Sequence, residues 1–285
     1  MRARIDLGSW ITSARVRIAD HSETPTLEAE LLLTHCLGQS RAWAATHPEA
    51  SLDAETVDRL DGLLERLVNG EPLPYLLGHW EFYGHDFCVS PAVLIPRPET
   101  ELLVETALGW LNCHSDSRRV VDVGTGSGCI AISLAAALTD LDLIATDISF
   151  NALRVAQLNQ NRLLVNPKLQ MIQADLLKSL PGPFDLIAAN LPYIPEYKLA
   201  GLKVTEHEPR LALDGGQDGL RFIKTLLEQS PTRLATPGCI LLEIEFEQGP
   251  TASSIASRIY PQASINVMPD LAGLPRILKI ETHEN

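Results

Sequence analysis

Four consecutive residues, Asn190-Leu191-Pro192-Tyr193, have side chains and backbone groups that could orient a planar amide for reaction. An amide nitrogen is a weak nucleophile because its lone pair is delocalised into the carbonyl, so attack by it depends on orientation and electrostatics. Asn190 offers a side-chain oxygen and Leu191 a backbone carbonyl, and together they could hold both N–H bonds of a target amide. Pro192 would stiffen the turn, and Tyr193 could stack on the planar group. The alternative is an ordinary turn at a strand end, where these residue types are common.

A glycine-rich segment, Gly124-Thr125-Gly126-Ser127-Gly128, is the second candidate site. It follows an apolar run, as expected for a backbone that approaches a ligand closely. Its G-x-G-x-G spacing differs from the dinucleotide fingerprint, and the absence of a following Lys-Ser or Lys-Thr excludes a P-loop. With Asp122 two residues before the first glycine, the segment resembles the loop of class I S-adenosylmethionine-dependent methyltransferases. The resemblance implies S-adenosyl-L-methionine as the cofactor.

Two aspartates follow the next two expected strands. Asp147 lies about 20 residues after the loop, where a carboxylate is suited to bind ribose hydroxyls; the alternative is that it caps a helix near Ser149. Asp175 could accept a hydrogen bond from the adenine amino group, and the N–H of Leu176 could reach a ring nitrogen; the alternative is a loop or capping aspartate. Asn190 is assigned to the cofactor site as well, because its strand should end beside the loop.

Alternating strand-like and helix-like segments from about residue 100 predict an α/β fold with a mainly parallel sheet. Together with the glycine loop they indicate a Rossmann-like class I methyltransferase domain, with its ligands beyond the carboxyl ends of the strands. The seven expected strands are 119–123, 141–146, 169–173, 184–189, 239–245, 265–268 and 276–280.

Three regions are expected along the chain. Residues 1–74 read as a small helical domain, with helices at 25–37 and 52–68 bounded by Gly38 and by Asn69-Gly70. Residues 75–98 read as a linker that contains a hairpin about Gly84. Residues 99–285 form the expected methyltransferase domain.

Composition narrows the classes of function. The formal net charge is −13 and the pI about 5.0, which disfavours general binding to nucleic-acid phosphates. The five cysteines show no metal-knuckle or redox spacing, so we expect no metal and reduced thiols, with Cys129 a small buried hydrophobe. No signal peptide or membrane-spanning run is seen. We therefore expect a cytoplasmic protein that acts as a monomer.

Three further stretches resemble one family in particular. They are Gly70–Tyr75 with Glu81-Phe82-Tyr83, Leu94–Glu101, and Glu208–Leu213 with Gly219-Leu220. With the glycine loop and the Asn190–Tyr193 segment, they resemble the peptide chain release factor glutamine methyltransferases, the HemK/PrmC family. The resemblance implies methylation of the glutamine in the Gly-Gly-Gln motif of class-1 release factors, with the helical region docking that partner. Leu191 departs from the family's proline, and Glu245 stands where glycine is more frequent.

Two other functions remain as alternatives. A nucleic-acid amino methyltransferase would need a basic and aromatic recognition region, and a non-catalytic module would bind only cofactor and partner. Arg97 is left open between pairing with a carboxylate over the bound glutamine and lying solvated in a connector. The chain's own Gly215-Gly216-Gln217 is interpreted as a turn.

Overall fold

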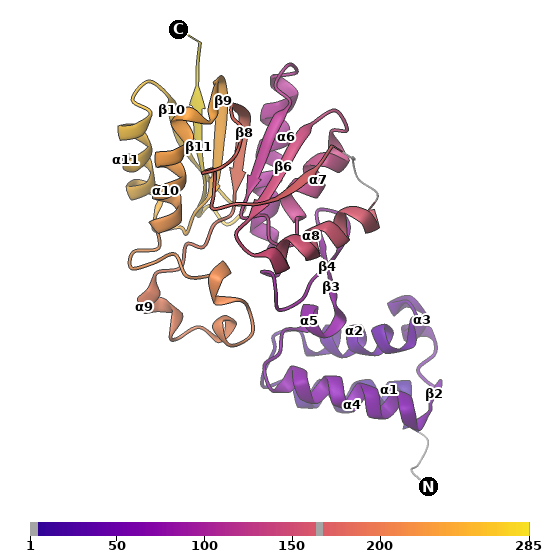
Figure 1. Cartoon of the computed structure of the whole chain (residues 1–285). Helices are drawn as coiled ribbons and strands as arrows, with labels where there is room; N and C mark the ends of the chain where they lie inside the picture. The colour runs from indigo at the N-terminus through magenta and orange to yellow at the C-terminus, as the bar shows by residue number, and fades with distance from the viewer. Residues whose placement is uncertain (1–4, 164–167, 285) are drawn as a thin grey trace. The chain divides into compact units, whose positions relative to one another are not determined.

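The chain folds into two units, Met1–Gly78 and His79–Asn285 (Figure 1). The computed structural model describes residues 5–163 and 168–284. The first unit is helical, as expected, and the second contains the main β-sheet.

The helices of the first unit begin and end where local signals place them. Helix α2 (Pro25–Leu37) ends at Gly38, which adopts a left-handed conformation (φ 63°). Helix α4 (Ala54–Val68) begins two residues later than predicted, because the Asp53 side chain caps it by accepting a 2.7 Å hydrogen bond from the Thr56 N–H. The unit also contains α1 (Leu7–Ile18), α3 (Arg41–Thr46), α5 (Leu73–Leu77) and the short strands β1 (Ile5–Asp6) and β2 (Ser51–Leu52).

A seven-stranded sheet organises the second unit, and all seven predicted strands are present. The strands are β5 (Arg119–Val123), β6 (Asp142–Asp147), β7 (Gln170–Gln173), β8 (Phe184–Ala189), β9 (Leu234–Glu243), β10 (Ser264–Pro269) and β11 (Pro275–Thr282). Their order is β10-β11-β9-β8-β5-β6-β7. The five neighbouring strands β9, β8, β5, β6 and β7 pair in parallel, whereas β11 pairs antiparallel with both β9 and β10.

Apolar residues cover both faces of the sheet, because neighbouring residues of a strand point in opposite directions. Val120 packs into one hydrophobic cluster and Val121 into the other. Helices α6 (Pro98–Cys113) and α7 (Cys129–Ala137) contribute to the first cluster, and α8 (Phe150–Leu163) contacts α7. Helices α10 (Arg221–Gln229) and α11 (Gly249–Ile259) cover the other face (Figure 1).

The predicted hairpin forms from β3 (His79–Phe82) and β4 (His85–Cys88). Its two turn residues, Tyr83 and Gly84, both have positive φ (50° and 73°). The buried Asn159 of α8 joins the hairpin to the glycine loop. Its Oδ1 accepts from the Cys88 N–H (2.7 Å), and its Nδ2 donates to the Ser127 carbonyl (2.8 Å). Asn159 thus holds the glycine loop through the Ser127 carbonyl.

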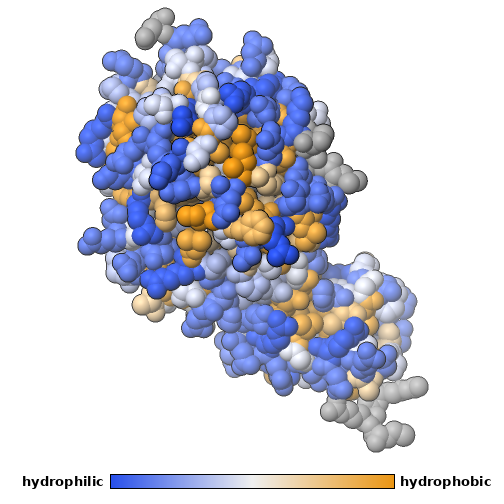
Figure 2. Space-filling view, viewed as in Figure 1, coloured by the Kyte–Doolittle hydropathy of each residue, from blue (hydrophilic) through white to orange (hydrophobic). Residues whose placement is uncertain are grey.

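Short helices connect β8 to α10 and α10 to β9: α9 (Glu196–Leu199), η1 (Lys203–Glu206), η2 (Arg210–Ala212) and η3 (Ser230–Thr232). Figure 2 shows a mainly hydrophilic outer surface, with hydrophobic residues gathered in the middle of the visible face of the second unit. Within residues 5–163 and 168–284, no helix combines the length and apolarity that crossing a membrane requires.

Candidate active site

The glycine loop leaves β5 in a conformation that its three glycines permit. Gly124, Gly126 and Gly128 have φ of 76°, 56° and 83°, a region that other residues rarely adopt. The Thr146 carbonyl accepts from the N–H groups of Gly124 and Thr125, both at 2.8 Å. A Cβ atom on Gly128 would lie 2.9 Å from Ile132 Cδ1. The spacing of the glycines therefore follows from the backbone that this turn requires.

Asp147 joins the end of β6 to this loop. Its Oδ2 accepts from the Gly126 N–H (2.9 Å) and its Oδ1 from the Ser149 N–H (2.8 Å). Burial raises its pKa, which the backbone N–H groups counteract. The Ser149 hydroxyl accepts from the Ala152 N–H (3.2 Å), so Ser149 supplies the side-chain cap of α8. The Asp147 carboxylate lies in the wall of the adjoining cavity.

Behind the loop lies Asp122, which is fully buried. Its Oδ2 accepts from the Thr125 hydroxyl (2.6 Å) and the Ala131 N–H (3.2 Å). Its Oδ1 has no hydrogen-bond partner among the described residues. Burial raises the pKa of Asp122 to about 7. The neighbouring Cys129 is buried too, with its pKa raised to about 12, as expected of an unreactive thiol.

Asp175 and Leu176 follow β7 and line the same cavity. Leu176 has a φ of 53°, a costly conformation for a residue with a branched side chain. Such backbone strain is concentrated at functional sites. The turn presents the carboxylate of Asp175 at the surface and places Leu176 in the core.

Asn190 begins the segment after β8, a strand whose apolar residues are buried on both faces. The Asn190 Nδ2 donates a 3.0 Å hydrogen bond to the Thr100 hydroxyl. Among the described residues none donates to Asn190 Oδ1. This acceptor is therefore available at the carboxyl edge of the sheet.

Leu191 packs on the glycine loop. It is 4% exposed, and a Cβ on Gly124 would lie 3.0 Å from Leu191 Cδ2. The Leu191 side chain, where the family has proline, thus fills the space over Gly124. The backbone carbonyl of residue 191 is the same with either residue. Leu191 and Pro192 both line the cavity.

Tyr193 turns away from the cavity and contacts β9. Its hydroxyl donates to Glu243 Oε1 (3.2 Å), and its carbonyl accepts from Gln248 Nε2 (2.9 Å). Burial raises the pKa of Tyr193, and the charge of Glu243 adds to this effect. Tyr193 therefore stays protonated, and the structure gives it a polar contact instead of the expected stacking position in the cavity.

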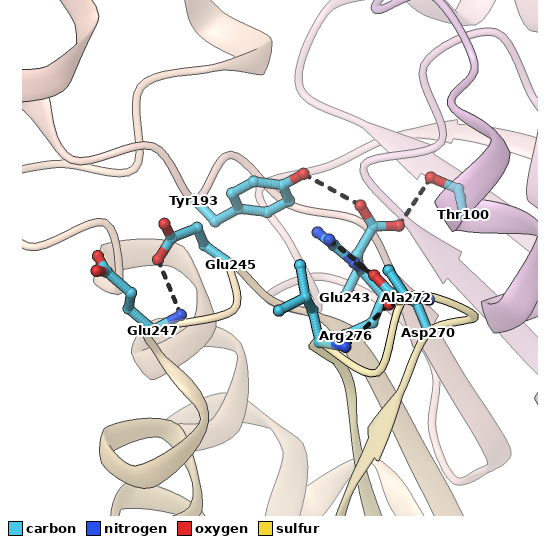
Figure 3. Close-up of polar contacts among 9 residues, drawn as sticks. Thr100, Tyr193, Glu243, Glu245, Glu247, Asp270, Ala272 and Arg276 are labelled. Atoms are coloured by element: carbon cyan, nitrogen blue, oxygen red, sulfur yellow. Dashed lines mark hydrogen bonds and ion pairs between the residues drawn. The ribbon is translucent and has the colours of Figure 1, made fainter.

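Two residues of this network, Thr100 and Glu243, were not identified from the sequence. Thr100 lies in the first turn of α6 and Glu243 ends β9; both are buried. The Thr100 hydroxyl donates to Glu243 Oε2 (2.7 Å) (Figure 3). The one available signal was a carboxylate in the otherwise apolar run CILLE. Glu245, which stands where the family more often has glycine, accepts from Lys198 Nζ (3.2 Å).

Arg97 is paired with a carboxylate, as one of its two alternatives expects, and its place over a bound glutamine stays a prediction. Its guanidinium donates to Glu208 Oε1, and Glu208 Oε2 accepts from the Ile95 N–H (3.1 Å). Glu208 is 5% exposed. The pair connects the stretch before α6 with the stretch before η2, and both contribute to the cavity wall.

A cavity of about 200 Å³ brings these segments together. Of the predicted site residues, Gly128 and Tyr193 do not line it. The predicted residues that do are Gly124, Thr125, Gly126, Ser127, Asp147, Asp175, Leu176, Asn190, Leu191 and Pro192. Because parallel strands end at one edge, loops distant in sequence share this cavity.

The chain's Gly215-Gly216-Gln217 lies against the Asn190–Tyr193 segment as a fixed turn. The Gly215 N–H donates to the Ile194 carbonyl (2.9 Å), and the Gly216 carbonyl accepts from the Glu196 N–H (2.8 Å). A Cβ on Gly215 would lie 2.8 Å from the Pro192 carbonyl oxygen. Gln217 is exposed and does not line the cavity.

Comparison with known proteins covers both units. Residues 9–78 match the family model of the PrmC N-terminal domain, and residues 98–206 match that of the Methyltransferase small domain. The release factor glutamine methyltransferase of Koribacter versatilis is 41% identical over 264 residues, covering 91% of this chain and 92% of the relative. The protein of that name in Nitratidesulfovibrio vulgaris is 39% identical over 281 residues, with coverage of 95% and 94%.

Solved structures agree on the fold. A methyltransferase from Pyrococcus furiosus superposes with a TM-score of 0.52 at 17% identity, covering 71% of this chain and 91% of the other. The N-terminal domain of human METTL16 in complex with SAH gives a TM-score of 0.50 at 17% identity, with coverage of 83% and 86%. At this identity the likeness shows the methyltransferase fold alone.

Proposed function

The chain belongs to the release factor glutamine methyltransferases, and from this premise we propose that it methylates the side-chain amide nitrogen of the glutamine in the Gly-Gly-Gln motif of class-1 peptide chain release factors. The methyl donor is S-adenosyl-L-methionine. The observation that carries the proposal is the Asn190 side chain, whose nitrogen is held by Thr100 while its oxygen is available beside the glycine loop.

The residues of the cavity fit this cofactor. Asp147 offers a half-buried carboxylate for ribose hydroxyls, and the loop from Gly124 to Gly128 lets the backbone approach a ligand closely. Asp175 and Leu176 lie at the end of the next strand, where adenine would be bound. When bound, S-adenosyl-L-methionine supplies the electrophilic methyl group of its sulfonium.

The chain's own part in the reaction is to orient a neutral amide. Asn190 Oδ1 accepts one N–H of the target glutamine, and the Leu191 carbonyl accepts the other. These two hydrogen bonds hold the nitrogen lone pair toward the methyl group, which gives rate by positioning. With S-adenosyl-L-methionine bound, its sulfonium would supply the methyl group to this nitrogen, and its sulfur would keep the electron pair of the carbon–sulfur bond. The amide nitrogen, positively charged once it carries the methyl group, then releases one proton to solvent.

We also propose that the N-terminal helical region, expected at residues 1–74, docks the release factor, with residues 75–98 linking it to a catalytic region at 99–285. The match of residues 9–78 to the PrmC N-terminal domain supports this assignment. Docking predicts a much higher kcat/KM for a full-length release factor than for a short Gly-Gly-Gln peptide. Equal values for the two substrates would refute docking.

We also propose that the chain is a cytoplasmic monomer and that it acts without nucleic acid. The formal net charge of −13 supports the last point, because it opposes binding to phosphate backbones. Light scattering of the purified chain should give the mass of one chain. Methylation of release factor should be unaffected by nuclease treatment. A dimer mass, or loss of activity after nuclease, would contradict these assignments.

The test of the reaction uses the full chain with methyl-labelled cofactor. Recombinant release factor, the same factor with its Gly-Gly-Gln glutamine changed to alanine, DNA and RNA are incubated separately, and peptides are mapped by mass spectrometry. Label should enter only the unmodified factor, at that glutamine. A Gln217→Ala chain serves as control for self-methylation and should transfer label normally. Label in nucleic acid, at another residue, or in no substrate would overturn the proposal.

A further inference from the structure

The buried carboxylate of Glu243 accepts hydrogen bonds from two hydroxyl groups, one at each of its oxygens (Figure 3). Thr100 donates to Oε2 (2.7 Å) and Tyr193 to Oε1 (3.2 Å). Glu243 is 1% exposed. Register places it there, because the parallel pair Ala189↔Leu242 ends β8 and β9 side by side, so that Asn190 and Glu243 both follow that pair.

The chemistry of a carboxylate sets the direction of these hydrogen bonds. An ionised carboxylate only accepts, so the single proton of the Thr100 hydroxyl is committed to Glu243. Thr100 then has only lone pairs left, and its other neighbour must be a donor. The Asn190 group that faces Thr100 must therefore be Nδ2, as observed at 3.0 Å.

We propose that Glu243, acting through Thr100, is a positioning residue that fixes which way the Asn190 side-chain amide faces, so that Oδ1 is presented to the target glutamine. The inference rests on the function proposed above. A side-chain amide rotated by 180° exchanges its oxygen for its NH2 group, with almost no change of shape. Such a rotation would set Asn190 NH2 against the NH2 of the substrate, two donors facing each other. The carboxylate removes that alternative, and Tyr193 on its other oxygen holds the far end of the same segment.

The pKa of Glu243 is raised overall, because burial outweighs the neighbouring groups that favour its charged form. Burial raises the pKa of Glu243, whereas the Thr100 and Tyr193 hydrogen bonds and the charge of Arg276 lower it; Glu99 raises it slightly. Arg276 is held by Asp270 at 3.0 Å (Figure 3). The positive charge of Arg276, at the start of β11, therefore helps to stabilise the Glu243 carboxylate.

The direct test replaces the hydroxyl that links the two residues. Thr100→Val keeps the shape of the side chain but removes the hydrogen bonds to both Glu243 and Asn190. Methyl transfer at saturating cofactor and release factor should fall by about 10-fold to 100-fold, the loss typical of removing a supporting partner. Cofactor affinity should stay within about twofold, since the proposed ribose and adenine contacts lie at the ends of β6 and β7 and not on α6. Thr100→Ser restores the hydroxyl and should recover most of the rate.

A matched control lies on the same helix. Thr106 donates only to the Leu102 carbonyl within α6, so Thr106→Val should leave transfer unchanged. If wild type and Thr100→Val transfer methyl equally, or if Thr100→Ser is as slow as Thr100→Val, the positioning role is wrong. Absence of transfer by the wild type would instead refute the proposed function.

The orientation of the amide can also be measured without activity. Neutron diffraction from crystals of the wild-type chain distinguishes the deuterated amide group of Asn190 from its oxygen and locates the Thr100 proton. Nδ2 facing Thr100, with the Thr100 proton on the Glu243 side, supports the inference. Oδ1 facing Thr100 would overturn it, whatever the rate of the Thr100→Val variant.

Discussion

The side-chain nitrogen of Asn190 lies 3.0 Å from the hydroxyl oxygen of Thr100, although the two residues are 90 positions apart in the chain. The contact joins the end of β8 to the first turn of α6, and through Thr100 it reaches Glu243 at the end of β9. Three elements therefore define the orientation of one amide.

Asp147→Ala should weaken binding of S-adenosyl-L-methionine. It removes a carboxylate suited to ribose and leaves the Gly126 and Ser149 N–H groups without their acceptor. The expected loss is about 1.5–3 kcal/mol, as for hydrogen bonds to charged groups. Calorimetry measures it, with Asp142→Ala at the exposed start of the same strand as control. An unchanged dissociation constant for the Asp147 variant would refute its assignment to the cofactor.

Leu191→Ala should destabilise the fold, because it empties the space over Gly124 that the buried side chain fills. The free energy of unfolding should fall by about 2–5 kcal/mol, the usual cost of a large-to-small change in a core. Urea denaturation measures this fall. Leu271→Ala, at a fully exposed leucine, should change the same quantity by less than about 0.5 kcal/mol. Equal effects at the two positions would show that Leu191 does not pack as described.

Leu191→Pro tests a different property of the same residue. Proline keeps the carbonyl that accepts the target N–H and pre-sets the turn, so turnover should be retained. Steady-state methylation of release factor is the measurement. A loss above about a hundredfold, roughly 2.7 kcal/mol, in a folded variant would show that the leucine side chain or its N–H takes part in catalysis.

Asp122→Asn should change how stability depends on pH. Burial raises the pKa of Asp122 from 3.8 to about 7 in the folded chain. Because the folded pKa is raised, the contribution of Asp122 to the free energy of unfolding is fully present below pH 3.8 and is lost as the pH rises through about 7. Asparagine does not ionise and loses nothing over this range. From pH 5 to pH 8 the variant should therefore gain on the order of 3 kcal/mol in free energy of unfolding relative to wild type. Denaturation of both proteins at the two pH values measures the difference, and parallel pH profiles would contradict it.

Local sequence signals were sufficient for most of the fold. Strands β5 and β8 match their predicted bounds, because each is a short apolar run between turn residues. Strand β9 begins five residues before the predicted start at Cys239 and ends two residues before the predicted end at Glu245. Pro-Gly pairs usually mark turns, yet Pro237-Gly238 lies within the strand, and Gly238 pairs with β11. Tertiary pairing decided that boundary.

In the candidate site, too, local motifs could be recognised from the sequence, whereas residues that depend on distant contacts could not. Motifs with fixed spacing, the glycine loop and the Asn190–Tyr193 segment, were recognisable because their backbone requirements are local. Thr100 and Glu243 were missed because their role depends on a hydrogen bond between residues 143 positions apart. The aromatic ring alone predicts a stacking role for Tyr193, whereas the partner of its hydroxyl lies on the neighbouring strand β9.

Asn190 provides the most direct test of the account. Asn190→Ala removes the acceptor for the target amide and should lower the rate of methyl transfer by about 3–4 kcal/mol, as for other preorganised polar groups. Asn190→Asp keeps an acceptor but sets a second oxygen against Thr100, whose proton is committed to Glu243. It should therefore be slower than wild type and faster than the alanine variant. Asn161→Ala, at an exposed position on α8, is the matched control.

The decisive measurement is single-turnover methylation of release factor by wild type, Asn190→Asp and Asn190→Ala, with cofactor binding measured in parallel. The rate should fall in the order wild type, Asn190→Asp, Asn190→Ala, with cofactor affinity nearly constant in the alanine variant. Near-normal transfer by Asn190→Ala would contradict the claim that this amide orients the target glutamine.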